Sequence, residues 1–129
     1  MYCIDTDIVI EYLRGNAKIV KKVEELKDKI SLTQITLLEL HFGAYISDKK
    51  EERLKQIKEL IGQFNIIDFN TESLNNFGII KSDLMKKGLS LDNFDLCIAS
   101  LALSHNKILV TNNVKHFKRI EKLRVENWL

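Results

Sequence analysis

Three acidic residues stand in apolar surroundings far apart along the chain. Asp5 follows Tyr-Cys-Ile, Glu39 lies within Leu-Leu-Glu-Leu, and Asp95 is followed by Leu-Cys-Ile-Ala. An ionised carboxylate that leaves water is destabilising unless a cation or hydrogen-bond donors compensate it. A shared divalent cation would compensate all three, and carboxylate oxygens are ligands that Mg²⁺ and Mn²⁺ prefer. The three residues therefore predict a metal site.

Local structural roles compete with the metal site for some of the acidic residues. Near the N-terminus, Asp7 rather than Asp5 is expected to cap the helix that follows, because Asp is a favoured N-cap residue. Glu39 shares a helical face with Ile35 and Phe42, so it points toward the core or stands at the margin of that face with its carboxylate in water. Asp5, two positions before Asp7, could also be a cap but is harder to explain in that way.

Asp95 has an acidic neighbour, Asp92, one helical turn earlier. Carboxylates three residues apart lie on the same side of a helix and can converge on one cation. Alternatively, Asp92 is the N-cap and Asp95 a first-turn acid favoured by the helix dipole. The apolar run over 96–103 indicates that this helix is largely buried, which favours the metal site.

Polar residues follow an apolar run near the C-terminus, in Ile-Leu-Val-Thr-Asn-Asn. In open parallel sheets the ligand crevice lies beyond the carboxyl ends of the strands, where Asp5 is also expected. Thr111, Asn112 and Asn113 are placed there to orient a water molecule or to bind a metal through oxygen. An Asn-Asn pair after a strand is also a common turn.

The elements that position these residues alternate between strand and helix. Apolar runs predict strands at 2–4, 30–33, 66–69 and 107–110, with a further edge strand near 124–125. Helical spacing predicts helices over 8–13, 17–27, 35–46, 53–63, 72–87 and 92–104. This alternation indicates an α/β fold with three α/β/α layers and a central parallel sheet of four to five short strands. In the helix over 72–87, the expected buried residues are Leu74, Phe77, Ile80 and Leu84.

Length and composition set limits on the class of protein. The 129 residues suit one domain spanning 1–129, and 45% hydrophobic with 29% charged residues excludes a disordered chain. No apolar stretch approaches the roughly 20 residues of a membrane span, and the N-terminus lacks a signal-peptide pattern. The expected location is cytoplasmic. Cys3 and Cys97 lack the spacing of a zinc site or a disulfide framework.

Five segments together resemble the PIN domain, specifically the VapC-type toxin ribonucleases of toxin-antitoxin pairs. They are Ile-Asp-Thr-Asp at 4–7, Thr-Leu-Leu-Glu-Leu-His-Phe-Gly-Ala at 36–44, Asn-Phe-Asp-Leu-Cys-Ile-Ala-Ser at 93–100, Leu-Val-Thr-Asn-Asn-Val-Lys-His-Phe at 109–117 and the ending Leu-Arg-Val-Glu-Asn-Trp. Their order and spacing, over essentially the whole length, carry the resemblance. It implies a PIN-like fold and a Mg²⁺- or Mn²⁺-dependent endoribonuclease.

The resemblance implies roles for individual residues. Asp5, Glu39 and Asp95 match the acidic core that holds the metal, and Thr6 and Thr111 match hydroxyl positions beside it.

Two positions depart from the family pattern. Asn113 stands where many relatives carry a fourth acid and others an Asn, and Asp7 stands where the family more often has Asn or Ser. The fourth ligand is therefore open, and Asp92, which is not a fixed feature of the family, is a candidate to supply the missing charge.

The resemblance also implies partners and products. It predicts a homodimer, an RNA substrate cut to a 5′-phosphate and a 3′-hydroxyl, and a cognate VapB-like antitoxin whose C-terminal segment reaches the acidic site.

Other functions fit the residues less well. Asp5 and Asp7 resemble the Asp-x-Asp of haloacid dehalogenase-type phosphatases, but the chain has no convincing equivalents of the later Lys, the further acidic pair and the cap domain. A phosphoryl-accepting receiver domain needs an Asp at the end of the third strand, and Asp68 lies inside the strand predicted at 66–69. The remaining alternative is a PIN-like domain that only binds RNA or protein. Asn113 in place of an acid favours it, and the three intact acids oppose it.

Overall fold

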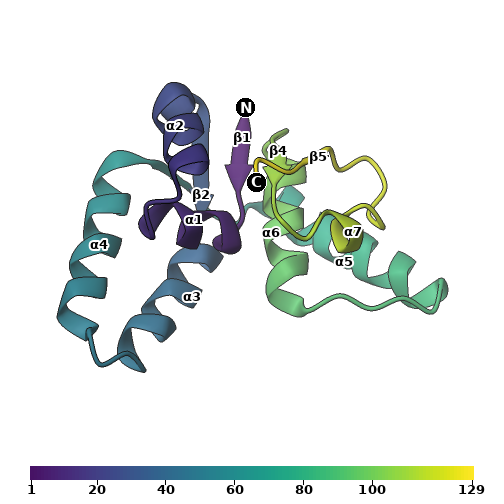
Figure 1. The fold of residues 1–129 in the computed structure, drawn as a ribbon. Helices are drawn as coiled ribbons and strands as arrows, with labels where there is room; N and C mark the ends of the chain where they lie inside the picture. The colour runs from purple at the N-terminus through teal and green to yellow at the C-terminus, as the bar shows by residue number, and fades with distance from the viewer.

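A central sheet of five strands runs through the computed structural model, which describes residues 1–129 (Figure 1). The strands are β1 (Tyr2–Ile4), β2 (Ile30–Thr33), β3 (Asn65–Ile67), β4 (Ile108–Val110) and β5 (Val125–Glu126). Their order is β3-β2-β1-β4-β5, and every neighbouring pair is parallel. The predicted parallel sheet is confirmed. The predicted end of the third strand is wrong, because β3 ends at Ile67 and Asp68 follows the strand instead of lying inside it.

All the predicted helices are present, with ends shifted by a few residues. They are α1 (Thr6–Leu13), α2 (Ala17–Leu26), α3 (Gln34–Tyr45), α4 (Lys50–Gln63), α5 (Thr71–Lys86) and α6 (Asn93–Ser104), followed by the short α7 (Val114–Phe117). None of them combines the length and the apolar character that a membrane crossing requires.

The two faces of the sheet contribute to separate hydrophobic cores. In β1, Cys3 packs into one core and Ile4 into the other, and in β4 Leu109 and Val110 divide in the same way. The core around Cys3 is completed mainly by α5 and α6, and the core around Ile4 by α1, α2 and α4. Both faces of each strand are covered, which explains the continuous apolar runs and confirms three α/β/α layers.

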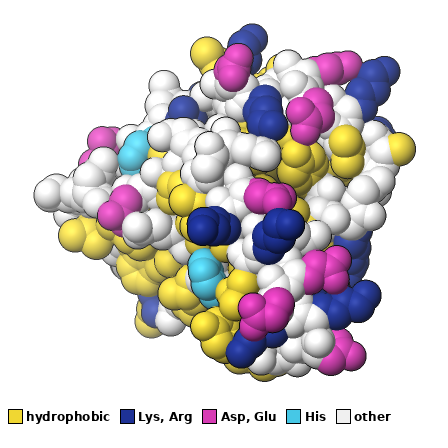
Figure 2. Space-filling model, turned by 90° about the vertical axis from the view of Figure 1, so that its left-hand side faces the viewer, with side chains coloured by type: hydrophobic (Ala, Val, Ile, Leu, Met, Phe, Trp, Pro, Cys, Tyr) yellow, Lys and Arg dark blue, Asp and Glu magenta, His cyan; other side chains and the backbone are white.

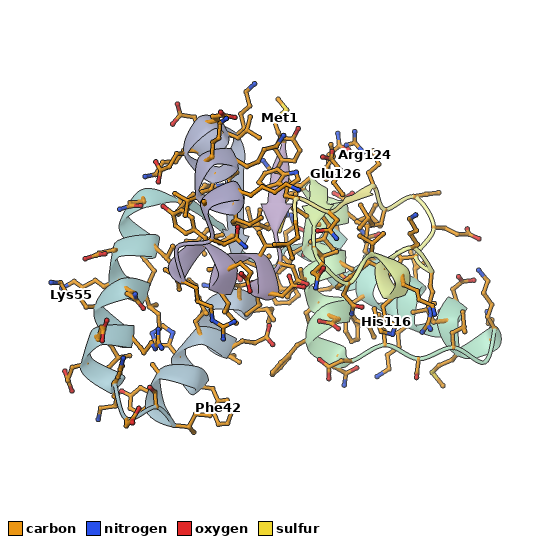
Figure 3. All side chains as sticks on the ribbon, viewed as in Figure 1. Met1, Phe42, Lys55, His116, Arg124 and Glu126 are labelled. Atoms are coloured by element: carbon orange, nitrogen blue, oxygen red, sulfur yellow. The ribbon has the colours of Figure 1, made fainter.

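Two helices expose apolar residues that the sequence placed in the core. In α5, Leu74 is 62% exposed, so its predicted burial is wrong. Ser73 is the residue of this turn that faces the core, and it forms a reciprocal capping pair with Asn70. Because successive residues of a helix are rotated by about 100°, Leu74 faces away from the core. In α3, Phe42 is 67% exposed, and Figure 3 shows it at the lower edge of the molecule, where no strand covers it.

Candidate metal centre

The strand order brings the carboxyl ends of β1 and β4 together. β2 lies on one side of β1 and β4 on the other, so the order of the strands reverses between β1 and β4. Such a switch point creates a crevice where open α/β sheets bind ligands. Asp5 directly follows β1 and Thr111 directly follows β4, and the Asp5 N–H donates to the Val110 carbonyl at 2.8 Å. The polar residues after the two strands therefore lie side by side.

A hollow of about 290 Å³ opens at this crevice. Its lining residues are Asp5, Thr6, Asp7, Ile10, Glu39, Asp95 and Asn113. The structure thus brings the three predicted acids together with Thr6 and Asn113, although they come from α1 and the residue before it, α3, α6 and the turn before α7. We call this group the acidic hollow.

Asp5 is buried at the base of the acidic hollow and caps α1. It is 6% exposed, and its extended backbone places it between the end of β1 and the first helical residue. Its Oδ1 accepts a hydrogen bond from the Thr6 N–H at 2.8 Å, and its Oδ2 accepts one from the Thr111 hydroxyl at 2.8 Å. The prediction that Asp7 would be the cap is wrong, because the helix begins immediately after the strand. Thr111 thus holds the Asp5 carboxylate through a hydrogen bond, although Thr111 itself does not line the hollow.

Asp7 is the site residue that the sequence analysis missed. It lies in the first turn of α1, where its Oδ2 accepts a hydrogen bond from the Asn112 N–H at 3.1 Å. Its Oδ1 is buried without any hydrogen-bond partner. A buried carboxylate oxygen needs a donor or a cation, and this one belongs to a residue that lines the hollow. The end of the strand at Ile4 was the available signal, because it assigns the cap to Asp5.

Glu39 is held at the acidic hollow by a chain of hydroxyl groups. The Thr6 hydroxyl donates to Glu39 Oε1 at 2.7 Å and lies 3.0 Å from the hydroxyl of the buried Thr36. The start of α3 is capped by Thr33, whose Oγ1 accepts from the Thr36 N–H at 3.1 Å. Glu39 is half-buried and hydrogen-bonded, so neither the core nor the fully solvated interpretation describes it.

Asp95 and Asp92 have different environments at the start of α6. Asp95 is half-buried and lines the acidic hollow. Asp92 is the exposed N-cap, and its Oδ2 accepts a hydrogen bond from the Phe94 N–H at 3.0 Å. It is not among the residues that line the hollow. The structure therefore gives Asp92 the capping role.

Burial and mutual repulsion dominate the electrostatics of this site. Burial, reinforced by the charge of Asp7, raises the pKa of Asp5 to about 7. Burial together with neighbouring carboxylates raises the pKa of Asp95 to about 6, and burial also raises the pKa of Asp7. A raised carboxyl pKa means that the folded protein disfavours the ionised form. A divalent cation would remove this penalty.

The donor set of the acidic hollow suits Mg²⁺ or Mn²⁺. Its side chains offer oxygen and amide groups and neither thiol nor imidazole. No three of the Asp, Glu, His and Cys side chains are grouped as a complete ligand set by themselves. Mg²⁺ commonly binds one or two carboxylates and keeps several water molecules, which the open hollow can admit. The residues present therefore fit a partly hydrated ion.

Comparison with known proteins identifies the family of this chain. The chain matches the PIN domain over residues 2–123. It is 37% identical to Ribonuclease VapC2 of Rickettsia felis, over 99% of this chain and 98% of that protein. It is 30% identical to the tRNA(fMet)-specific endonuclease VapC of Shigella flexneri, over 98% of this chain and 97% of that one. Among solved structures it resembles VapBC2 from Rickettsia felis bound to a promoter DNA fragment, with a TM-score of 0.92 and 35% identity over 99% of this chain and 98% of that chain. The chain therefore belongs to the PIN-domain family and, within it, to the VapC ribonucleases.

Proposed function

We propose that the protein is an endoribonuclease that hydrolyses RNA phosphodiester bonds with Mg²⁺ or Mn²⁺, as the toxin of a toxin-antitoxin pair. The observation that carries this proposal is the acidic hollow, in which four carboxylates from three helices and a strand end converge at the switch point of the sheet. The relatives named ribonuclease and endonuclease support it.

In this proposal the side chains divide the work of the site. Asp5, Asp7 and Asp95 would hold the metal together with water molecules that complete its coordination, and Glu39 would act beside it. The bound metal would lower the pKa of a water molecule and neutralise charge on the phosphate. Thr111 and the Thr6 N–H hold both oxygens of Asp5 in place. The Thr6 hydroxyl occupies one oxygen of Glu39, which leaves Oε2 to accept a proton from water.

RNA cleavage by the purified protein tests the proposed function. Pools of transfer RNA and ribosomal RNA would be incubated with Mg²⁺ or Mn²⁺, with EDTA, and with an Asp95→Asn variant. We expect discrete cuts that require the metal and disappear in the variant. No cleavage by folded protein free of antitoxin would instead support the non-catalytic binding module.

We also propose that a VapB-like antitoxin binds in a cleft beside the acidic hollow. This cleft of about 280 Å³ is lined by α1, α3 and α4, and it shares Thr6, Ile10 and Glu39 with the hollow. Apolar walls, including Leu13 and Leu40, suit apolar side chains of a peptide, and Arg14 and Arg53 suit its acidic groups. The carboxylates next to the cleft would attract a basic side chain.

Filling this cleft is expected to weaken antitoxin binding at least about tenfold, or about 1.4 kcal/mol. Gly43 lines the cleft, and a Cβ there meets nothing within 4 Å, so Gly43→Leu should fold normally. Gly62→Leu is the matched control, because Gly62 is also helical with nothing within 4 Å but lies outside the cleft. Isothermal titration with the cognate antitoxin measures the difference. Equal affinities for the two variants would contradict the assignment.

We further propose that the chain forms a homodimer through an exposed apolar face. Phe69, Leu74, Phe77 and Cys97 line an entirely apolar hollow there. Figure 2 views the molecule from the side that is on the left in Figure 1, and hydrophobic side chains gather toward its lower left edge. Exposed apolar patches of this kind mark interaction surfaces.

The dimer proposal predicts the effect of a charge on that face. Leu74→Lys is expected to convert a dimer of 15.0 kDa chains to monomers, because the dimer would bury a charge without a partner. Ile61→Lys on α4 is the control, since Ile61 is 47% exposed and lies outside this hollow. Sedimentation analysis reads the mass directly. A monomeric wild-type protein would refute the proposal.

A further inference from the structure

Asn113 is held at the rim of the acidic hollow by its backbone. Its N–H donates to the Thr111 hydroxyl oxygen at 3.0 Å, and its carbonyl accepts from the His116 N–H at 3.2 Å. Although Asn113 occupies the N-cap of α7, its side chain makes no capping hydrogen bond. The carboxamide is therefore not used by the helix that it precedes, and it lines the hollow instead.

His116 determines which way this carboxamide faces. The Nδ1 of His116 is hydrogen-bonded to Asn113 Oδ1. Because an amide oxygen can only accept, the imidazole must donate from Nδ1. The amide oxygen is thereby engaged, and the NH₂ group remains for another partner. In Figure 3 His116 is labelled at α7, in the half of the molecule that also contains α6, the helix that carries Asp95.

The NH₂ group of Asn113 is a hydrogen-bond donor in a hollow that contains mainly acceptors. Its four carboxylates are acceptors when ionised, and the oxygens of an RNA phosphate are acceptors too. Only Thr6 and Asn113 among the lining side chains can donate, and the Thr6 hydroxyl already donates to Glu39. The NH₂ group of Asn113 is thus the one lining side-chain donor that remains for a substrate.

Building on the ribonuclease function proposed above, we propose that His116 is a positioning residue that holds Asn113 as a hydrogen-bond donor to a non-bridging oxygen of the scissile phosphate. In this role Asn113 does not supply oxygen to the metal, because the hydrogen bond to His116 turns the amide oxygen toward the imidazole and the NH₂ group toward the hollow. The site therefore does not need a fourth acid at position 113. A fixed donor of this kind stabilises charge that develops on the phosphate.

A double-mutant cycle tests whether His116 acts through Asn113. The rates are measured on the RNA that the wild-type protein cleaves in the pool experiment. We expect Asn113→Ala to lower kcat about 100-fold and His116→Ala to lower it about tenfold. The double variant should be no slower than Asn113→Ala alone, since the histidine has nothing left to position. If kcat of the double variant falls by the product of the two single losses, the proposal is overturned.

Two further measurements separate positioning from metal binding and from folding. Mn²⁺ affinity should be unchanged in both single variants, and a loss of affinity would return Asn113 to the ligand set. His116→Asn should restore most of the rate, because its side-chain N–H lies near the place of Nδ1, whereas His116→Gln should not. His41→Ala is the control, because His41 is exposed and its Nδ1 contacts only a carbonyl of its own helix. If the wild-type protein does not cleave RNA, the proposed function is overturned. If the wild-type protein cleaves RNA and His116→Ala cleaves it at the same rate, only this inference is overturned.

Discussion

Asp5→Asn is expected to lower the rate of RNA cleavage by about a thousandfold or more, because it removes a negative charge from the base of the proposed metal site. The fold should be retained. Asn is as good an N-cap residue as Asp, and its side-chain oxygen can still accept from the Thr6 N–H. Loss of activity would therefore reflect the missing carboxylate charge and not unfolding. Single-turnover kinetics measures the rate of cleavage, and Mn²⁺ titration measures the affinity for the metal.

Asp68→Asn provides a matched control for this experiment. Asp68 follows β3 as Asp5 follows β1, and its Oδ1 accepts from the next backbone N–H at 2.7 Å. It lies outside the acidic hollow and is exposed. Its replacement should leave cleavage and Mn²⁺ affinity at wild-type levels. A pure preparation of Asp5→Asn that still cleaves RNA would exclude the proposed site.

The second large effect concerns the stability of the metal-free protein, which is expected to fall as the pH rises. A carboxyl with a raised pKa holds more protons in the folded protein than in the unfolded chain, so folding loses free energy as that carboxyl ionises. For Asp5 the loss runs from its ordinary pKa of 3.8 to about 7, and for Asp95 from 3.8 to about 6. The free energy of unfolding that these carboxyls contribute is therefore fully present below about pH 4 and is lost above about pH 7.

At about 1.4 kcal/mol per pKa unit, the two shifts together correspond to about 7 kcal/mol. Solvent screens the half-exposed Asp95 and weakens its interactions with the other carboxylates, so the expected loss is on the order of 3 kcal/mol, or about 10 °C in Tm, between about pH 4 and pH 8. Mg²⁺ or Mn²⁺ should reverse it, because the cation binds the ionised carboxylates of the folded state. Thermal unfolding followed by circular dichroism, with EDTA and with the metal, measures both curves. Asp5→Asn should flatten the EDTA curve. Stability in EDTA that rises through this pH range would contradict the electrostatics of the acidic hollow.

The sequence predicted the scaffold well because its signals are local. Strands covered on both faces need continuous apolar runs, and helices that cover them need apolar residues at helical spacing. Asp5, Glu39 and Asp95 were recognisable for a related reason, since charged residues seldom occur among core-like neighbours without compensation.

Periodicity did not reveal which of two neighbouring residues faces the site. Asp7 was assigned to a cap, and the structure places it in the acidic hollow because α1 begins directly after β1. Leu74 was assigned to the core, and it is exposed because Ser73 takes the inward position of that turn. Each outcome depends on where an element begins, and a shift of one residue rotates a helical side chain by about 100°.

The amino-acid sequence by itself determined the α/β class, the strands and helices and three of the acids that line the acidic hollow, because these follow from hydrophobic patterning along the chain. Only the tertiary structure decided that Asp7 joins those acids, that Asp92 caps α6, and that His116 occupies the oxygen of Asn113. These features depend on the strand order, which joins the ends of β1 and β4, and on the orientation of single side chains in that crevice. Hydrogen bonds and repulsion between residues up to 106 positions apart in sequence set those orientations, and local spacing carries no record of them.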